Sequence, residues 1–289
     1  QRDQKVLTEL VGRQPGGMGG NVACAASRLG LRTGMVSWVG DDAEGRQILA
    51  DLQRFGVDTR HITVQPGTST NYTTVLLDPS GEKAILIVPT SFDILALDPP
   101  LTAYLQSARL VYCAAYDPDQ LRRVANVVHA AGGLVSTDIE PAAGLADETL
   151  IDLLAVVDLA FIDAETAAAE DYEETARYWR GLGPELVIMT FGAAGSLACN
   201  ATGLTRCPAF KVPVIDTTGA GDCFTAAFLT AYLRRLPLES TLRYASAAAA
   251  LSIQGYGARS ALPTDAQVHT FLAGHPQASQ NWPFPQAKT

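Results

Sequence analysis

The sequence predicts an α/β protein with a mainly parallel sheet, helices on both faces of that sheet, and a small antiparallel sheet beside it. Strand-like and helix-like stretches alternate through the second half of the chain, and two Thr- and Val-rich runs joined by a turn stand out in the first half. The chain has 289 residues, 47% of them hydrophobic. This is enough for one large core, or for one core with a small appendage.

The alternation begins near residue 110. We expect helices around residues 119–129, 147–156 and 173–182, between strands at 110–113, 134–137, 159–162 and 186–190. A βαβα order is typical of a parallel sheet, and such sheets bind ligands at the carboxyl ends of their strands. Asp138, Asp163 and Thr190 come where predicted strands end, so we expect them at the binding edge.

In the first half we expect strands at 5–11 and 33–39 and a helix at 44–55. Residues 69–77 and 83–88 read as a hairpin, because the turn between them contains Pro79 and Gly81. With 5–11 they form a predicted antiparallel sheet that could serve as a lid, a dimer surface or both. The alternative is that they are edge strands of the main sheet.

Composition excludes several functions. The net charge of −9 and the absence of a basic run argue against a nucleic-acid partner. The five cysteines are scattered without a C-x-x-C pair, which indicates reduced thiols rather than disulfides or a zinc site. No apolar run is long enough to span a membrane, and no signal peptide is visible. We therefore expect a cytoplasmic protein that does not bind membranes.

The most informative stretch is 216–228. It follows a strand-like run at 210–215 and leads into a predicted helix with Phe224, Phe228 and Tyr232 on one face. The small residues Gly219, Ala220 and Gly221 would lie at the start of this helix. Backbone N–H groups and the positive end of the helix dipole meet there, so these residues predict an anion hole.

Asp222 would lie in the first turn of the same helix. A carboxylate beside an anion hole is typical of phosphoryl transfer: the amides hold the transferred group while Asp222 accepts a proton from the attacking hydroxyl. A weak base suffices, because a loose transition state needs only late proton transfer. The alternative is an ordinary capping Asp at a Gly-rich helix start.

Two other Gly-rich segments are weaker signals. Before a small-residue helix at 22–29 come Gly16, Gly17, Gly19, Gly20 and Asn21. The glycines let a ligand approach the backbone, and Asn21 offers donors and acceptors; a flexible turn is the alternative. Val22 rules out a dinucleotide fingerprint, and no Walker P-loop occurs. Residues 192–195 could lie against a nucleotide or form a hairpin turn.

Read together, residues 16–40 and 216–229 resemble the two signature patterns of the ribokinase-like (PfkB) carbohydrate kinase family. Asp41, the hairpin, the 192–195 loop and residues 257–259 also come in the order of that family. The resemblance covers essentially the whole chain. It implies a single ribokinase-like domain over residues 1–289, with a β lid formed from about 5–13 and 61–90.

The resemblance implies transfer of the γ-phosphate of ATP, with Mg²⁺, to a primary hydroxyl of a sugar or nucleoside. Asp222 would be the catalytic base, and residues 219–221 the anion hole. Asp41 and the segment from Gly16 to Asn21 would line the sugar site. The residues that would approach ATP are Thr190, Gly192, Gly195 and Thr217. Many members bind a monovalent cation such as K⁺, and the corresponding residues are Asp216, Thr218, Ser252, Gly255 and Gly257.

Three departures from the family pattern bear on this reading. The usual first strand is missing, and we expect an N-terminal extension before Gln1 in the natural protein. The Asn-x-x-Glu element reads Asp163-Ala164-Glu165-Thr166, in which Asp163 could still order a water bound to Mg²⁺ and Glu165 is one position away from the usual Glu. Residues 89–93 replace a Gly-Ala-Asn sequence. The departures are more similar to the sulfofructose-kinase branch than to ribokinase itself.

We therefore expect an ATP-dependent sugar kinase. A nucleoside kinase of the same family is the near alternative, and a non-catalytic sugar or nucleotide sensor the distant one. An intact Asp222 argues against a sensor, which needs no base. Apolar faces on the lid hairpin make a homodimer through the lid an expectation as well.

Overall fold

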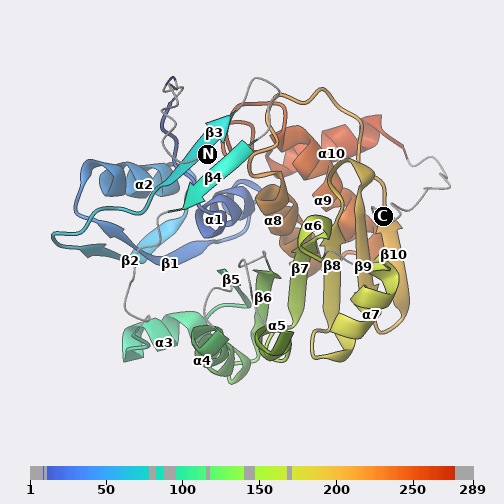
Figure 1. Ribbon diagram of the computed structural model, residues 1–289, viewed down its shortest axis with the longest axis horizontal. Helices are drawn as coiled ribbons and strands as arrows, with labels where there is room; N and C mark the ends of the chain where they lie inside the picture. The colour runs from blue at the N-terminus through green and yellow to red at the C-terminus, as the bar shows by residue number, and fades with distance from the viewer. Residues whose placement is uncertain are drawn as a thin grey trace, which may run out of the picture.

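The computed structural model describes residues 9, 12–77, 83–87, 96–114, 118–139, 147–167 and 171–276 (Figure 1). Its centre is a six-stranded sheet in the order β10-β9-β8-β7-β6-β5. Four strands pair in parallel, and β9 and β10 continue the sheet in antiparallel fashion. In chain order the strands are β5 (Leu110–Ala114), β6 (Leu134–Ile139), β7 (Leu159–Asp163), β8 (Leu186–Thr190), β9 (Ser196–Asn200) and β10 (Gly203–Cys207). The predicted mainly parallel sheet is confirmed.

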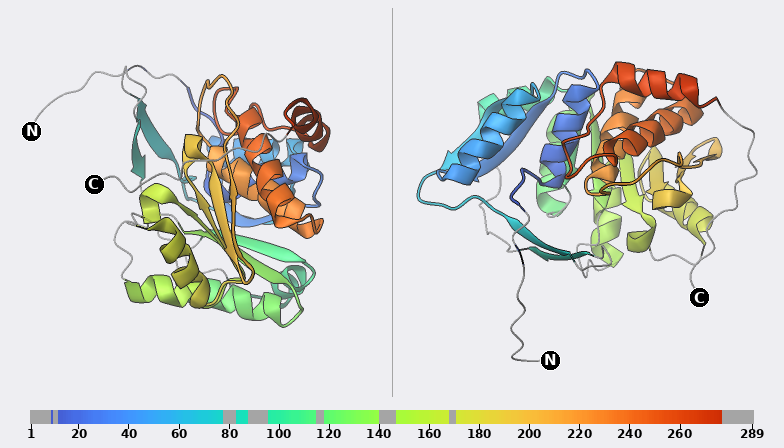
Figure 2. Two further views of the ribbon diagram at one scale, coloured as in Figure 1. Left: turned by 90° about the vertical axis from the view of Figure 1, so that its right-hand side faces the viewer. Right: turned by 90° about the horizontal axis from the view of Figure 1, so that it is seen from above.

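Helices cover both faces of this sheet (Figure 2). One layer contains α1 (Met18–Arg28), α8 (Ala220–Leu233), α9 (Leu238–Ser252) and α10 (Asp265–Gly274). The other contains α3 (Pro99–Gln106), α4 (Pro118–His129), α5 (Asp147–Leu154) and α7 (Tyr172–Gly181). Side chains alternate along β7, so Leu159 and Phe161 pack into the first layer and Ala160 and Ile162 into the second. This burial on both faces explains the continuous apolar runs of these strands.

The N-terminal region forms two further small sheets. Strands β1 (Gly34–Gly40) and β2 (Asp58–Gln65) pair in parallel, with α2 (Ala43–Arg54) connecting them. Strands β3 (Thr73–Leu77) and β4 (Lys83–Ile87) form the predicted antiparallel hairpin as a separate sheet, which stands away from the helical layers in Figure 2.

The boundaries of the predicted lid need correction. Residues 61–65, which we assigned to the lid, lie in β2 and pair in parallel with β1, so they are not part of the hairpin. The turn at 78–82, the departure at 89–93 and, apart from residue 9, the expected strand at 5–11 lie outside the described residues. A homodimer through the hairpin stays a prediction, and the exposed side chains of Val75, Leu76 and Leu86 on its strands are consistent with it.

Two local predictions were wrong. Residues 210–215 are not a strand: Pro213 has no N–H to give to a ladder, and Ile215 and Asp216 donate theirs to the carbonyl of Ile253, at 2.9 and 3.2 Å. Helix α1 begins at Met18 rather than at residue 22, because Gly17 takes a positive φ of 84° and starts the helix four residues earlier. Gly19, Gly20 and Asn21 are therefore helical and not in a loop.

Asp42 caps the helix that follows β1. Its carboxylate accepts hydrogen bonds from the Gly45 N–H at 2.8 Å and from the Thr70 N–H at 2.7 Å, and also from the Thr70 hydroxyl. These hydrogen bonds, that of the Thr70 side chain foremost, lower the pKa of Asp42 from 3.8 to about 2. Bonds that favour the charged form stabilise the fold only while Asp42 is ionised.

Acid should therefore weaken the fold through Asp42. Because its pKa is lower in the folded protein, its contribution is present above about pH 4 and is lost as the pH falls toward 2. Asn at position 42 can still cap the helix but carries no charge. We expect Asp42→Asn to lower the urea midpoint at pH 6, and the difference from the wild type to shrink by pH 2. A difference that stays constant with pH would contradict this assignment.

Candidate active site

The first turn of α8 is built on a glycine that no other residue could replace without strain. Gly219 precedes the helix with a left-handed φ of 77°. A Cβ at this position would lie 2.6 Å from the Cβ of Ala258 and 2.9 Å from its Cα. Backbone conformation and packing against Ala258 therefore both demand glycine here.

The backbone amides of this turn differ in their partners. The Ala220 N–H donates to the carbonyl of Thr217 at 3.1 Å, and the Cys223 N–H to that of Gly219 at 2.9 Å. Among the described residues the Gly221 N–H has no backbone acceptor, and Gly221 is exposed. Of the predicted anion-hole residues, Gly221 thus offers an N–H to a ligand, whereas that of Ala220 already closes the turn.

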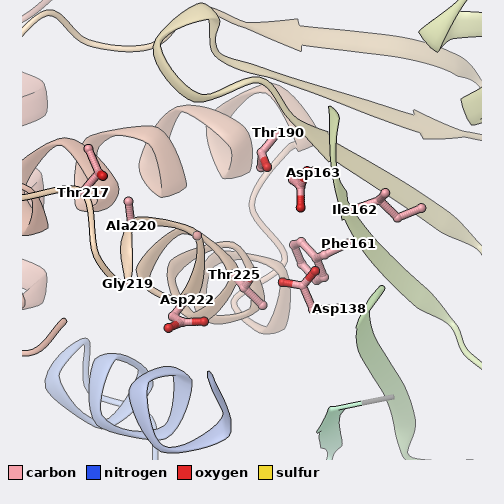
Figure 3. Close-up of a pocket in the computed structure, with 11 residues that line it drawn as sticks. Asp138, Phe161, Ile162, Asp163, Thr190, Thr217, Gly219, Ala220, Asp222 and Thr225 are labelled. Carbon is pink, nitrogen blue, oxygen red and sulfur yellow. The ribbon is translucent and has the colours of Figure 1, made fainter. Parts of the chain in front are cut away.

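Asp222 lies on the side of α8 that faces α1 (Figure 3). Its Oδ2 accepts a hydrogen bond from Nδ2 of Asn21 at 2.7 Å. Asn21 is 6% exposed, and its Oδ1 accepts from Nε of Arg259 at 2.8 Å. The same guanidinium donates to the carbonyl of Gly16 at 2.7 Å. It packs so closely on Gly20 that a Cβ added there would lie 2.5 Å from its Nη2 atom. The structure therefore brings the two Gly-rich signatures together.

In front of this turn is a cavity of about 200 Å³ between α8 and the carboxyl ends of three sheet strands (Figure 3). The expected edge residues Asp138, Asp163 and Thr190 all line it, at the ends of β6, β7 and β8. The remaining lining residues are Phe161, Ile162, Thr217, Gly219, Ala220, Gly221, Asp222 and Thr225. We call this space the Asp222 cavity.

Two carboxylates could hold a metal ion at this cavity. Asp138 and Asp163 lie at the carboxyl ends of the adjacent parallel strands β6 and β7, and both line the Asp222 cavity. No group of three or more potential metal ligands from His, Cys, Asp and Glu occurs in the described part of the chain. Two carboxylates fit Mg²⁺, which usually keeps several waters and takes its other ligands from substrate phosphates. The side chains of residues 165 and 166 are not described.

The predicted monovalent-cation residues come together in part. Oδ1 of Asp216 accepts from the N–H and hydroxyl of Thr218 at 2.9 and 2.7 Å, and Oδ2 accepts from the Gly257 N–H at 2.9 Å. Ser252 is buried at the end of α9, and its hydroxyl donates to the Ala249 carbonyl. Gly255 lies beside Ser260. Carboxylate and carbonyl oxygens are the ligands that a hard cation requires.

Of the remaining residues that were predicted to bind nucleotide or sugar, some line the Asp222 cavity and others do not. Thr217 is in its lining, but Gly192 and Gly195 are not. They form a tight 3₁₀ turn between β8 and β9, in which Phe191 donates its N–H to the Gly195 carbonyl at 2.8 Å. Asp41 is exposed after β1, and its carbonyl accepts from Arg46.

The thiol next to Asp222 is not a nucleophile. Cys223 is fully buried in α8, and burial raises the pKa of its thiol to about 12. Burial likewise raises the pKa of Cys113 to about 12. All five cysteines are free, as the sequence predicted. Asp222 is therefore the candidate reactive group in the first turn of α8.

Sequence reasoning missed two residues of this site. Arg259 is 7% exposed and contacts Asn21, Gly16 and Asp51, although we noted it only for its order in the chain. Asp51 lies on α2, and its Oδ2 accepts from Nη1 of Arg259 at 2.7 Å. The sequence holds one signal for Asp51: it is an acidic residue beside the apolar positions Ile48, Leu52 and Phe55 of an amphipathic helix.

Comparisons with known proteins agree with this geometry. A family model described as pfkB family carbohydrate kinase matches residues 2–265. The ATP-dependent ribose-1-phosphate kinase of Halopiger xanaduensis is 31% identical over 258 residues, which cover 89% of this chain and 86% of the relative.

Solved structures give the same result. Ribokinase of Arabidopsis thaliana complexed with ribose and ATP superposes with a TM-score of 0.79 at 26% identity, over 89% of this chain and 86% of the other. Aminoimidazole riboside kinase of Salmonella enterica, complexed with aminoimidazole riboside and an ATP analog, gives 0.76 at 26% identity, over 89% and 91%. The fold is ribokinase-like.

Within the described ranges, no helix is both long and apolar enough to cross a bilayer. The match of the family model to nearly the whole chain decides the classification. This chain belongs to the pfkB family of carbohydrate kinases, phosphotransferases with an alcohol group as acceptor.

Proposed function

We propose that this protein is an ATP-dependent kinase that transfers the γ-phosphoryl group to a primary hydroxyl of a sugar. One observation carries the proposal: the Asp222 carboxylate and the Gly219–Gly221 turn share a cavity with Asp138 and Asp163. A base, an anion site and carboxylates for a cation are the parts that phosphoryl transfer requires.

In the proposed reaction the acceptor hydroxyl gives its proton to Asp222 as its oxygen bonds to the γ-phosphorus. The bond from that phosphorus to the bridging oxygen breaks, and ADP leaves with the electron pair. The N–H of Gly221 and the positive end of α8 hold the charge of the transferred group. Asn21 holds the Asp222 carboxylate in place through its hydrogen bond.

Asp138 and Asp163 would hold Mg²⁺, which when bound neutralises phosphate charge. Asp216 and the carbonyls of Thr218, Ser252, Gly255 and Gly257 would hold K⁺ beside the anion site. Asp216 already fixes the positions of Thr218 and Gly257, so a cation there would stiffen the segment that precedes α8. Thr190 and Thr217, which line the cavity, would contact the nucleotide.

Some of the relatives suggest which acceptors to test first. The names of the three proteins compared refer to ribose 1-phosphate, ribose and aminoimidazole riboside, which all contain a ribose unit. Ribose and its derivatives are therefore the first acceptors to test. The third name supports a nucleoside kinase as the second candidate. A sensor is disfavoured, because Asp222 is held by the buried side chain of Asn21, an arrangement that binding alone does not need.

The test is an ADP-release assay with Mg²⁺-ATP and K⁺ against ribose, ribose 1-phosphate, hexoses, sugar acids, sulfosugars and nucleosides. We expect one class to be turned over at about 1–100 s⁻¹, the usual range of kinases, and the rate to collapse when Mg²⁺ is chelated. Replacing K⁺ by Na⁺ tests the monovalent site. Silence with ATP binding retained would favour a sensor, and silence without ATP binding would contradict the proposed site.

A further inference from the structure

Outside the proposed catalytic turn, the described residues include a buried guanidinium, that of Arg259. The side chain of Arg259 is 6% exposed, and that of its partner Asp51 is 11% exposed. A charged pair at this depth is expensive to desolvate, so it contributes little to stability compared with apolar side chains of the same volume. Its position beside Asn21 and the catalytic turn makes a role in the site worth testing.

The contacts of Arg259 leave its guanidinium no freedom. Nε donates to Oδ1 of Asn21 at 2.8 Å, Nη1 to Oδ2 of Asp51 at 2.7 Å, and Nη2 to the Gly16 carbonyl at 2.7 Å. A planar fork with donors on three sides is a property of Arg that Lys does not share. The three contacts fix the plane of the guanidinium against α1 and α2.

The chemistry of these groups decides which way the Asn21 amide points. A guanidinium has only donors, so the atom of Asn21 that faces it must be the oxygen. The NH₂ group then has to point the other way, toward Asp222, whose ionised carboxylate has only acceptors. The orientation of the amide, and with it the position of the carboxylate, therefore follows from Arg259.

We propose that Arg259 and Asp51 are positioning residues for the catalytic base: through Asn21 they hold Asp222 in its working orientation. This inference rests on the proposed function. It also changes the reading of Asn21, which the sequence placed in the sugar site. If Asn21 acts mainly on Asp222, its loss should lower kcat, whereas a sugar ligand would raise KM.

The main test removes both charges at once with Asp51→Leu and Arg259→Met. A buried pair replaced on both sides leaves no uncompensated charge, so the double variant should fold with a thermal midpoint near that of the wild type. We expect kcat to fall about 10- to 100-fold, the effect of a small misplacement of a catalytic group, with little change in KM for ATP or acceptor. An unchanged kcat, or a fall matched by a proportional rise in KM, overturns the proposal.

A second variant covers the case in which the double variant fails to fold. Arg259→Lys keeps a positive charge for Asp51 but cannot reach all three acceptors with the same geometry. We expect it to fold and to lose part of kcat, intermediate between the wild type and the double variant; wild-type kcat in this variant overturns the proposal. Arg54→Ala is the control, because it removes the exposed partner of Asp51 (72% exposed) and leaves Arg259 paired. We expect it to have wild-type kinetics.

A measurement that does not require turnover distinguishes a failure of this inference from a failure of the proposed function. The Nδ2 proton of Asn21 that is bonded to Asp222 should exchange slowly with solvent in the wild type, as followed by NMR, because Asn21 is buried. In the double variant the amide is free to turn, and exchange should quicken. Equal exchange in both proteins overturns the positioning role even if no substrate is found. Faster exchange supports it independently of which substrate the enzyme takes.

Discussion

Replacing Asp222 by Asn is expected to lower kcat by about 10²- to 10⁴-fold, the usual contribution of a general base. Asn has the shape of Asp, and its oxygen can still accept the 2.7 Å hydrogen bond from Asn21. The change therefore removes the proton acceptor and little else. ATP binding should persist, because the Gly221 amide and the end of α8 are untouched. The measurements are steady-state kinetics with the acceptor found in the panel, and ATP affinity by calorimetry.

The matched control is Asp119→Asn, the same chemical change on the exposed start of α4, where the carboxylate is 84% exposed. It should leave kcat unchanged. Wild-type turnover by Asp222→Asn would remove Asp222 from the mechanism. If ATP binding disappeared together with turnover, the loss would lie in the anion site, and the role of base would have no support from this variant.

The fold was largely predictable because its core strands are buried on both faces. Apolar runs such as 159–162 and 186–190 need no partner to be recognised as strands, and they occur at the predicted places. The wrong predictions concern segments whose backbone conformation is decided by tertiary contacts. The apolar run at 210–215 has the composition of a strand, but its last residues bond to the carbonyl at the end of α9, which no local pattern records.

The residues of the candidate site likewise divide into those that a local motif predicts and those that only tertiary contacts bring together. Gly219 and Asp222 are close in sequence, so one motif predicts both the turn and the carboxylate within it. Arg259 and Asp51 are 208 positions apart, and they meet only because α1, α2 and the segment after α9 converge. A single Arg in a polar loop carries no sign of its burial. The residues proposed to contact the reacting groups were accessible from sequence, whereas Arg259 and Asp51, proposed to position them, were not.

Gly219→Ala should be the second most damaging change. The new Cβ would press on the Cβ and Cα of Ala258 at 2.6 and 2.9 Å, in a backbone conformation that costs an L-residue roughly 1–2 kcal/mol. The turn that presents the Gly221 N–H has to shift to relieve this contact. Loss of one donor to a developing charge typically lowers kcat by about 10²- to 10³-fold, and we expect a loss in this range.

Gly181→Ala is the control for Gly219→Ala. It places the same methyl group at the end of α7, where a Cβ would meet no atom within 4 Å and no positive φ is required. Kinetics and thermal midpoints of both variants separate the two effects of the methyl group at position 219: strain lowers the midpoint, and displacement of the turn lowers kcat. A Gly219→Ala protein with a lowered midpoint but wild-type kcat would show that this turn does not hold the transferred group. The negative charge of the transferred group would then have to be met by the cation that Asp138 and Asp163, on the other side of the cavity, would hold.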